Sequence, residues 1–204
     1  MSNLAAYRIA ILALLTDAGN AIFSNDMVDQ ALRWALAEYS NRRPLIRTYQ
    51  YSVDSTTGIH NLPTDFVTKH ITKVELYDAD PDSIIQLGFY AYKRDEQWII
   101  NTNYQVEAGE VLQVSYTDIH TVDNLDAAAG TTIPIEDEPI LHIGAAGRAA
   151  LLRSLDRVES INMNADTVKE YRQLAMEYID RFFALTSPEA GVGVGSPEYP
   201  EVKF

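Results

Sequence analysis

Cysteine is absent from this sequence of 204 residues, and basic residues are few. The absence of cysteine excludes disulfides and thiolate chemistry, and it fits a reducing compartment. Lysine and arginine total 16 against 29 acidic residues, so the net charge is −13. Because an averaged negative field repels nucleic acid, we expect no high-affinity wrapping of DNA.

Long hydrophobic runs are also missing. The most apolar segment, 4–15, is too short to span a bilayer. No basic region precedes it, as one would in a signal peptide, and Arg8 lies inside it. Its apolar residues recur at helical spacing, at Leu4, Tyr7, Ile11 and Leu14. This spacing predicts a packed amphipathic helix, and we expect neither a membrane anchor nor a membrane partner.

Recognisable catalytic and metal-binding motifs are lacking as well. The histidines have no paired-ligand spacing: His60, His70, His120 and His142. The acidic segment 78–82 resembles the opening of a calcium loop, but Ser83 and Phe89 replace the required glycine and glutamate. The glycine-rich segment 191–195 lacks the Lys-Ser/Thr pair of a phosphate loop. We therefore expect no enzyme, no cofactor and no metal.

What the chain does contain is a periodicity that changes twice, which predicts an α+β fold. Helical spacing begins after Ser24 or Asn25, both good N-caps, and stops at Pro44. Period-two alternation follows in four runs: Tyr49, Tyr51 and Val53; Thr72, Val74 and Leu76; the run around Trp98; and Leu112, Val114 and Tyr116. Segment 107–110 predicts the turn of an antiparallel hairpin between the last two runs, and 54–58 another turn.

Helical spacing returns after a polar loop. Gly144 and Gly147 lie at the centre of an apolar stripe that runs from Ile140 through Leu155 to Val158. Because glycine inside a helix costs about 1 kcal/mol relative to alanine, close approach by another helix is the expected compensation. A last helix, capped by Asn164 or Asp166, predicts an antiparallel helical hairpin.

These patterns divide the chain into five predicted segments. They are N-terminal helices of a helical core in 1–46, a β-rich insertion in 47–120, a loop in 121–139, a C-terminal antiparallel helical hairpin of the same core in 140–186, and an extended tail in 187–204. The tail has apolar residues that a purely solvated segment would not need: Val192, Val194, Tyr199, Val202 and Phe204. Simple disorder and docking into a neighbour both fit this composition.

A cluster of three arginines follows the second predicted helix: Arg42, Arg43 and Arg47. One interpretation is that they complement the helix dipole and lie on solvated surface. The other is that they contact an anion or an acidic neighbour.

Segment 58–66 reads Gly-Ile-His-Asn-Leu-Pro-Thr-Asp-Phe and precedes the predicted strand 71–76. In any fold, Pro63 would end the strand led by Ile59, while Leu62 and Phe66 would anchor the turn to a core. This Leu62-Pro63-x-Asp65-Phe66 element, with helices before and after a β insertion, resembles the neck adaptor proteins of tailed bacteriophages and related gene-transfer particles.

The resemblance implies a structural role in the virion neck, with assembly in the host cytoplasm. It implies a homo-oligomeric ring, usually of twelve subunits, that joins the portal at the capsid vertex to a downstream neck or tail protein. The ring would form part of the channel through which double-stranded DNA leaves without sequence-specific binding. The helical core would pack around the ring, the β insertion would face the tail-side partner, and the C-terminal tail would reach the portal.

A second hypothesis belongs to another class of protein. The chain would be a small α+β enzyme or ligand-binding protein whose pocket is lined by aromatic residues of the strands, namely Tyr49, Tyr51, Trp98 and Tyr116. Aromatic residues on strands are also ordinary core residues.

Overall fold

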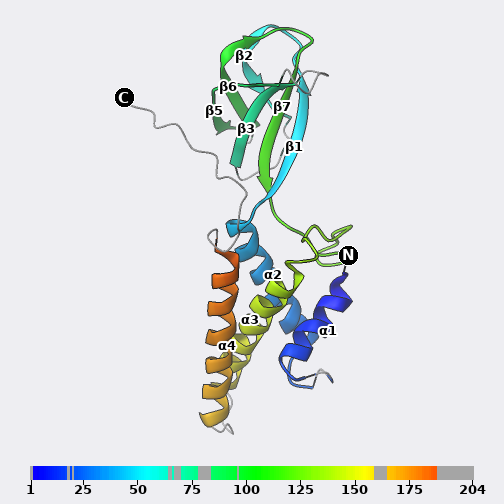
Figure 1. Ribbon diagram of the computed structural model, residues 1–204, viewed down its shortest axis with the longest axis vertical. Coiled ribbons are helices and arrows are strands. Elements are labelled where there is room, and N and C mark those ends of the chain that lie inside the picture. Colours follow the sequence, from blue (N-terminus) through cyan, green and yellow to red (C-terminus); the bar gives the residue numbers. More distant parts are fainter. Residues whose placement is uncertain are drawn as a thin grey trace, which may run out of the picture. The chain divides into compact units, whose positions relative to one another are not determined.

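The computed structural model describes residues 2–17, 19, 21–63, 66, 70–77, 84–95, 97–158 and 165–187 (Figure 1). The chain forms two compact units: Pro44–Ile119 is one, and Met1–Arg43 with His120–Phe204 is the other. We call them the β unit and the helical unit. Helices and antiparallel sheets both occur, so the predicted α+β class is confirmed, and so is the C-terminal helical hairpin.

The described part of the helical unit contains four helices: α1 (Leu4–Leu14), α2 (Asn25–Arg42), α3 (Glu138–Val158) and α4 (Ala165–Thr186). The first two begin at side-chain caps, because Asn3 accepts from the backbone N–H of Ala6 and Ser24 accepts from that of Met27. α2 ends at Arg42, and its C-cap Arg43 directly precedes Pro44, which the sequence predicts as a stop. α3 contacts each of the other three helices.

The interior of α3 consists of small residues because neighbouring helices pack close to it. Four alanines of α3 are fully buried: Ala145, Ala146, Ala149 and Ala150. A Cβ added at Gly144 would lie 2.6 Å from the ring of Phe182 in α4, and one at Gly147 would lie 3.0 Å from the backbone nitrogen of Ile179. The close approach expected at the two glycines is therefore present. Leu155, however, is 50% exposed, so the predicted apolar stripe is not buried at that position.

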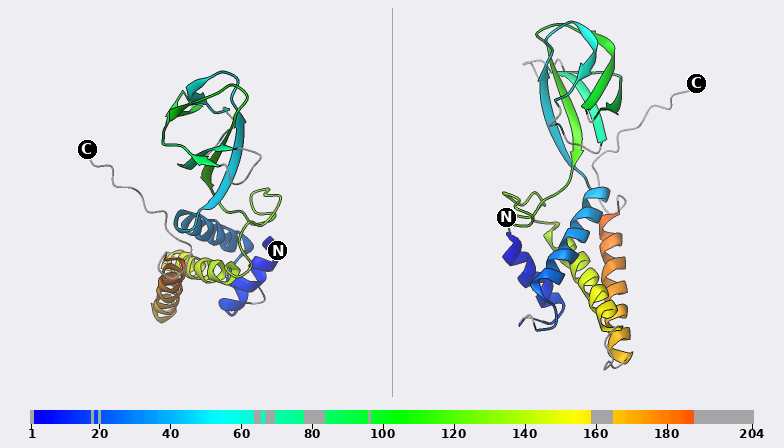
Figure 2. Two further views of the ribbon diagram at one scale, coloured as in Figure 1. Left: turned by 45° about the horizontal axis from the view of Figure 1, so that its top comes forward. Right: turned by 180° about the vertical axis from the view of Figure 1, so that it is seen from behind.

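The β unit consists of two antiparallel sheets (Figures 1 and 2). The first has the order β1 (Leu45–Ser52), β7 (Val111–Asp118), β3 (His70–Tyr77) and β4 (Ile85–Gln86). The second has the order β2 (Thr57–Asn61), β6 (Gln97–Val106) and β5 (Phe89–Arg94). A hydrophobic core with residues from both sheets includes Val74, Leu112 and Val114 from the first and Ile100 and Val106 from the second. Each unit thus has its own core.

Several strand predictions were wrong in detail. Segment 107–110 is a turn, but it does not close a hairpin, because β6 and β7 belong to different sheets. Its backbone pairs instead with Val53, which accepts from Gly109 N–H and donates to Glu110 O at 2.8 and 2.9 Å, and this directs β7 towards β1.

The predicted face of β3 and the number of strands also differ from expectation. The ladder between β3 and β7 shifts register between Ile71 and Lys73, so Ile71 is buried and Thr72 is exposed. Strands β4 and β5 were not predicted, and β2 begins at Thr57, inside the expected turn.

The close α3–α4 contact predicts that Gly144→Ala and Gly147→Ala each destabilise the protein. Overpacking costs about 1–3 kcal/mol, and the better helix propensity of alanine returns up to about 1 kcal/mol, so we expect a net loss in both variants. Chemical denaturation would measure it. Gly130→Ala is the matched control, because a Cβ there meets nothing within 4 Å, and unchanged stability in all three variants would contradict the close contact.

Candidate interaction surfaces

Arg43 lies where the chain leaves the helical unit, and its side chain joins three segments of that unit. Its guanidinium donates to both carboxylate oxygens of Asp137, at 3.1 and 3.2 Å, and to the carbonyl oxygen of Leu185 at 2.9 Å. The hydroxyl of Tyr39 also donates to Asp137. Burial and the neighbouring carboxylate of Asp137 raise the pKa of Tyr39 above its usual range. Arg43 is therefore occupied by structural partners.

His120 lies where the chain returns to the helical unit. Its Nε2 is 3.1 Å from the carbonyl oxygen of Arg43, and its Nδ1 is 3.2 Å from both the carbonyl and hydroxyl oxygens of Thr132. Its backbone N–H donates to the hydroxyl of Ser40 at 2.9 Å. Because His120 bonds to Arg43, the two points at which the chain crosses between units are tied together on the helical side.

The other two arginines of the predicted cluster also have partners within their own units. Arg42 lies over the ring of Phe183, 4.4 Å from its centroid, which is a cation–π contact. Arg47 is the residue of the cluster that belongs to the β unit, where it forms an ion pair with Asp118 at 2.7 Å. The partners of all three arginines are distant in sequence, so sequence reasoning had no signal for them. An anion contact through these arginines stays a prediction.

The Leu-Pro-x-Asp-Phe element lies against the core of the β unit. Leu62 is fully buried, and its N–H donates to Trp98 O at 2.9 Å. Phe66 is 8% exposed and packs its ring against those of Tyr49 and Tyr116. The N–H of Phe66 donates to Pro63 O at 3.0 Å, so a turn brings the phenyl ring back to the sheet. Asp65 lies outside the described residues.

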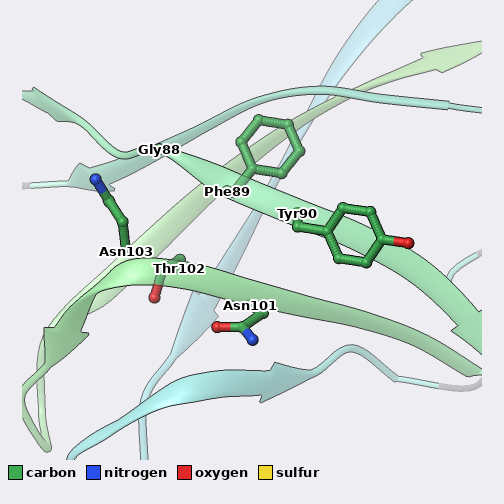
Figure 3. Close-up of a pocket in the computed structure, with 6 residues that line it drawn as sticks. All are labelled: Gly88, Phe89, Tyr90, Asn101, Thr102 and Asn103. Carbon is green, nitrogen blue, oxygen red and sulfur yellow. The ribbon is translucent and has the colours of Figure 1, made fainter. Parts of the chain in front are cut away.

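The aromatic residues proposed to line a ligand pocket pack against the hydrophobic core of the β unit instead: Tyr49, Tyr51, Trp98 and Tyr116. A pocket of about 330 Å³ occurs elsewhere in this unit, and Figure 3 shows the residues from β5, β6 and the adjoining Gly88 that line it. They are Gly88, Phe89, Tyr90, Asn101, Thr102 and Asn103. None of these residues is a carboxylate, histidine, lysine or arginine, so the lining offers hydrogen bonds but no general base.

The second sheet of the β unit exposes large apolar side chains. One cross-strand row of the second sheet pairs Ile59, Asn101 and Tyr90. Ile59 is 54% exposed and Tyr90 is 68% exposed, with the ring of Tyr92 5.7 Å away from that of Tyr90.

A cross-strand row of the first sheet is polar, although Glu75 in it is only 7% exposed: Gln50, Gln113, Glu75 and Gln86. In the second sheet, by contrast, exposed Tyr90 and Ile59 lie beside the uncharged amide of Asn101, and such a combination is typical of protein-binding surfaces. Sequence reasoning missed this surface because β5 was not predicted.

The histidines lie in separate places, and no group of three histidine, aspartate or glutamate side chains in the described part of the chain is arranged to hold a metal ion. His60 is 1% exposed inside the β unit, with Nε2 3.4 Å from the hydroxyl of Thr102. His142 lies in α3, with its ring 4.9 Å from that of Tyr7. Burial lowers the pKa of both histidines, and for His142 the nearby Glu138 offsets this only in part.

Besides Asp65, further predicted segments fall on residues that the structure does not describe. The first is the acidic segment 78–83. The second is the set of tail residues proposed to bind the portal: Val192, Val194, Tyr199, Val202 and Phe204. Among the described helices, none has the length and apolar character needed to cross a membrane.

Comparisons with known proteins identify no family. No protein-family model matches the chain, and no curated protein matches it. Among solved structures, the chain is similar to one from the neck of an empty GTA particle computed with C6 symmetry. The identity is 14%, the TM-score is 0.31, and the match covers 83% of this chain and 88% of that one. A TM-score below 0.5 does not establish a common fold.

The Arg43 network predicts a large stability cost for Arg43→Ala. The substitution leaves Leu185 O and part of the Asp137 carboxylate without a donor, and we expect a loss of about 2–3 kcal/mol in chemical denaturation. Arg33→Ala is the control, because Arg33 and Asp126 form an exposed ion pair with side chains 49% and 59% exposed, and such pairs contribute at most about 1 kcal/mol. Equal losses in the two variants would contradict a structural role specific to Arg43.

The lowered histidine pKa values predict a stability that declines in mild acid. The unfolded chain takes up protons near the ordinary histidine pKa of 6.5, and the folded chain does so only at lower pH. Stability is therefore complete above that pH and falls as pH decreases below it, by at most about 1.4 kcal/mol per pH unit for each group. His142→Gln should reduce this slope in denaturation curves measured from pH 7.5 to 5, whereas an unchanged slope would contradict the lowered pKa.

Proposed function

We propose that this protein is a non-enzymatic structural adaptor of a tailed-phage neck, which forms an oligomeric ring between the portal and a downstream neck or tail protein. The observation that carries this proposal is the presence of two separately folded units, each with its own core and its own exposed apolar side chains. Ile9 is exposed in the helical unit, and Ile59 and Tyr90 in the β unit. A chain with two such surfaces is suited to contact different neighbours.

The local chemistry supports an assembly role over catalysis. The Leu62-Pro63-x-x-Phe66 turn is an anchor within the core of the β unit, and the proposed aromatic pocket is filled by packed side chains. The pocket lined by β5, β6 and Gly88 has no acid–base pair in its lining. Buried anchors and exposed apolar surfaces are what an adaptor requires of its residues.

We assign the parts of the ring as follows. Segments 1–46 and 140–186 form its helical core, 47–120 is the insertion that faces the tail-side partner, 121–139 is a connecting loop, and 187–204 reaches the portal. The net charge of −13 favours a DNA channel with little adhesion to the passing duplex, because phosphates are repelled by a negative wall. The mature protein then resides in the virion neck after assembly in the host cytoplasm.

Deletion of 188–204 tests the tail contact. We expect the cognate portal to retain at least tenfold less of the truncated protein than of the full chain in a pull-down, because the apolar tail residues supply the anchors. A full-length variant with Val192, Val194 and Phe204 replaced by serine should lose binding similarly. The truncated chain should keep the circular dichroism and thermal midpoint of the full chain.

Two results would count against these assignments. Undiminished portal binding by both variants would remove the tail from the proposal. Particles that lack the protein yet join heads to tails would remove the adaptor function itself.

A further inference from the structure

Strand β1 forms one edge of the first sheet (Figure 1). It pairs with β7 in an unbroken register over all 8 of its residues, and no described residue pairs with its other side. An edge strand presents a row of backbone N–H and C=O groups that can bind another strand, so proteins protect such edges with short strands, bulges or charges. β1 is long and regular, and its one charged residue, Arg47, is held by Asp118.

The other edges of the β unit have such protection. β4 has only 2 residues, and the part of β3 that β4 leaves uncovered contains a register shift and Lys73. β2 has 5 residues and a register shift after Thr57. β5 ends in Lys93 and Arg94. Among the described strands, β1 is therefore the edge to which another strand can add without first displacing a charge or a bulge.

The backbone of Val53, the residue after β1, shows which groups of β1 face the open edge. Val53 donates its N–H to Glu110 O at 2.9 Å and accepts from Gly109 N–H at 2.8 Å, so both of its groups point to the β7 side. In an antiparallel ladder, the backbone groups of successive residues alternate between the two sides of the strand. The N–H and C=O groups that face the open edge are consequently those of Ile46, Thr48, Gln50 and Ser52.

The middle of the sheet has the same alternation. Val74 of β3 accepts from Leu87 N–H at 2.9 Å, so its backbone groups point away from β7. Val114 of β7 lies between Val74 and Tyr49 in the two ladders. Because Val114 is not bonded to Val74, it bonds to Tyr49, and the even-numbered neighbours of Tyr49 face the open edge.

These groups match those of a second copy in one antiparallel register. With Ile46 opposite Ser52 of the second copy and Thr48 opposite its Gln50, every N–H and C=O group of the open edge finds a partner. A shift by one residue would place these groups opposite residues whose own groups already bond to β7. A shift by two residues would place one end of the row opposite Pro44 or Asp54, which lie outside β1.

Side chains and charge also fit this register. β1 has no acidic residue, so two copies of a chain with net charge −13 meet there without opposing carboxylates. Tyr49 lies opposite Tyr49 of the second copy and Arg47 opposite its Tyr51, so an aromatic pair forms and no like charges are opposed. Tyr49 and Tyr51 are half-buried at the edge of the core, and pairing covers more of both rings.

We infer that two copies of the free protein associate through β1, edge to edge and antiparallel, in the register that places Thr48 opposite Gln50. The contact uses the same strand of both chains, so it is two-fold symmetric and closes after two copies. It therefore differs from the contacts of the proposed ring and does not rest on them.

Disulfide trapping in the full-length chain tests the register, because the sequence has no cysteine. Thr48→Cys and Gln50→Cys change exposed residues, and hydrogen-bonded antiparallel pairs have Cα atoms about 5.5 Å apart, which suits a disulfide. One variant carries a mass tag. On mild oxidation with diamide, we expect the mixture to give at least fivefold more disulfide dimer than either variant alone. Gln173→Cys, on an exposed position of α4, is the matched control and should not link to Thr48→Cys.

Thr48→Pro tests the hydrogen bonds themselves. The N–H of Thr48 faces the open edge, so proline removes no bond to β7, and edge strands tolerate proline at such positions. We expect sedimentation equilibrium of the full-length chain to show a concentration-dependent dimer. Thr48→Pro should raise its dissociation constant at least tenfold with an unchanged thermal midpoint. Thr48→Ala, which keeps the N–H, is the matched control and should dimerise like the original chain.

The other outcomes are distinguishable. A dimer that Thr48→Pro leaves intact, or a mixture that links no better than the single variants, would overturn the inference. A chain that stays monomeric at every concentration would overturn it too, and the adaptor function would stand if that chain still formed a ring with the portal. Protection of the β1 amides from hydrogen exchange by the tail-side partner, without self-association, would assign this edge to that partner instead. A β1 dimer that forms no ring with the portal would support the inference and count against the adaptor function.

Discussion

The close contact between α3 and α4 is the constraint on which the helical unit depends. Gly144 and Gly147 let α4 approach until its aromatic side chains touch the α3 backbone. That approach places Leu185, near the end of α4, where its carbonyl oxygen accepts from Arg43. Since Arg43 also holds Asp137 before α3, the packing of one helical hairpin determines where the chain leaves and re-enters the helical unit.

The two units contain different kinds of stabilising interaction. The helical unit contains the long-range polar network around Arg43, Asp137 and His120, which fixes the ends of an inserted segment. The β unit contains a separate hydrophobic core and exposes apolar side chains on both sheets, such as Ile46 on the first and Tyr90 on the second. Such a division suits a subunit that assembles with neighbours through several surfaces, because each unit keeps its fold while its exterior meets a partner.

Local patterns predicted the elements well where one face of an element is buried. The caps of α2, the stop at Pro44 and the glycines of α3 agree with the structure because each depends on neighbouring residues or on one packed helix. The β-rich region was harder. A bulge after Ile71 moved Thr72 off the core face, and the turn at 107–110 joined two sheets. The bulge and the change of sheet both depend on pairing with strands that are far away in the sequence. Period-two alternation within one strand carries no information about that pairing.

The amino-acid sequence alone determined the α+β class, the helical hairpin and the negative charge, since these follow from periodicity and composition. The tertiary structure decided the roles of individual polar residues. Arg43 is an obvious candidate for an anion contact in the sequence, yet it binds Asp137, 94 residues away. Likewise Ile9 and Ile11 are the same residue type in the same helix. Packing against the core makes Ile11 buried and leaves Ile9 exposed. Long-range contacts make that distinction because burial depends on where a surface meets the rest of the fold.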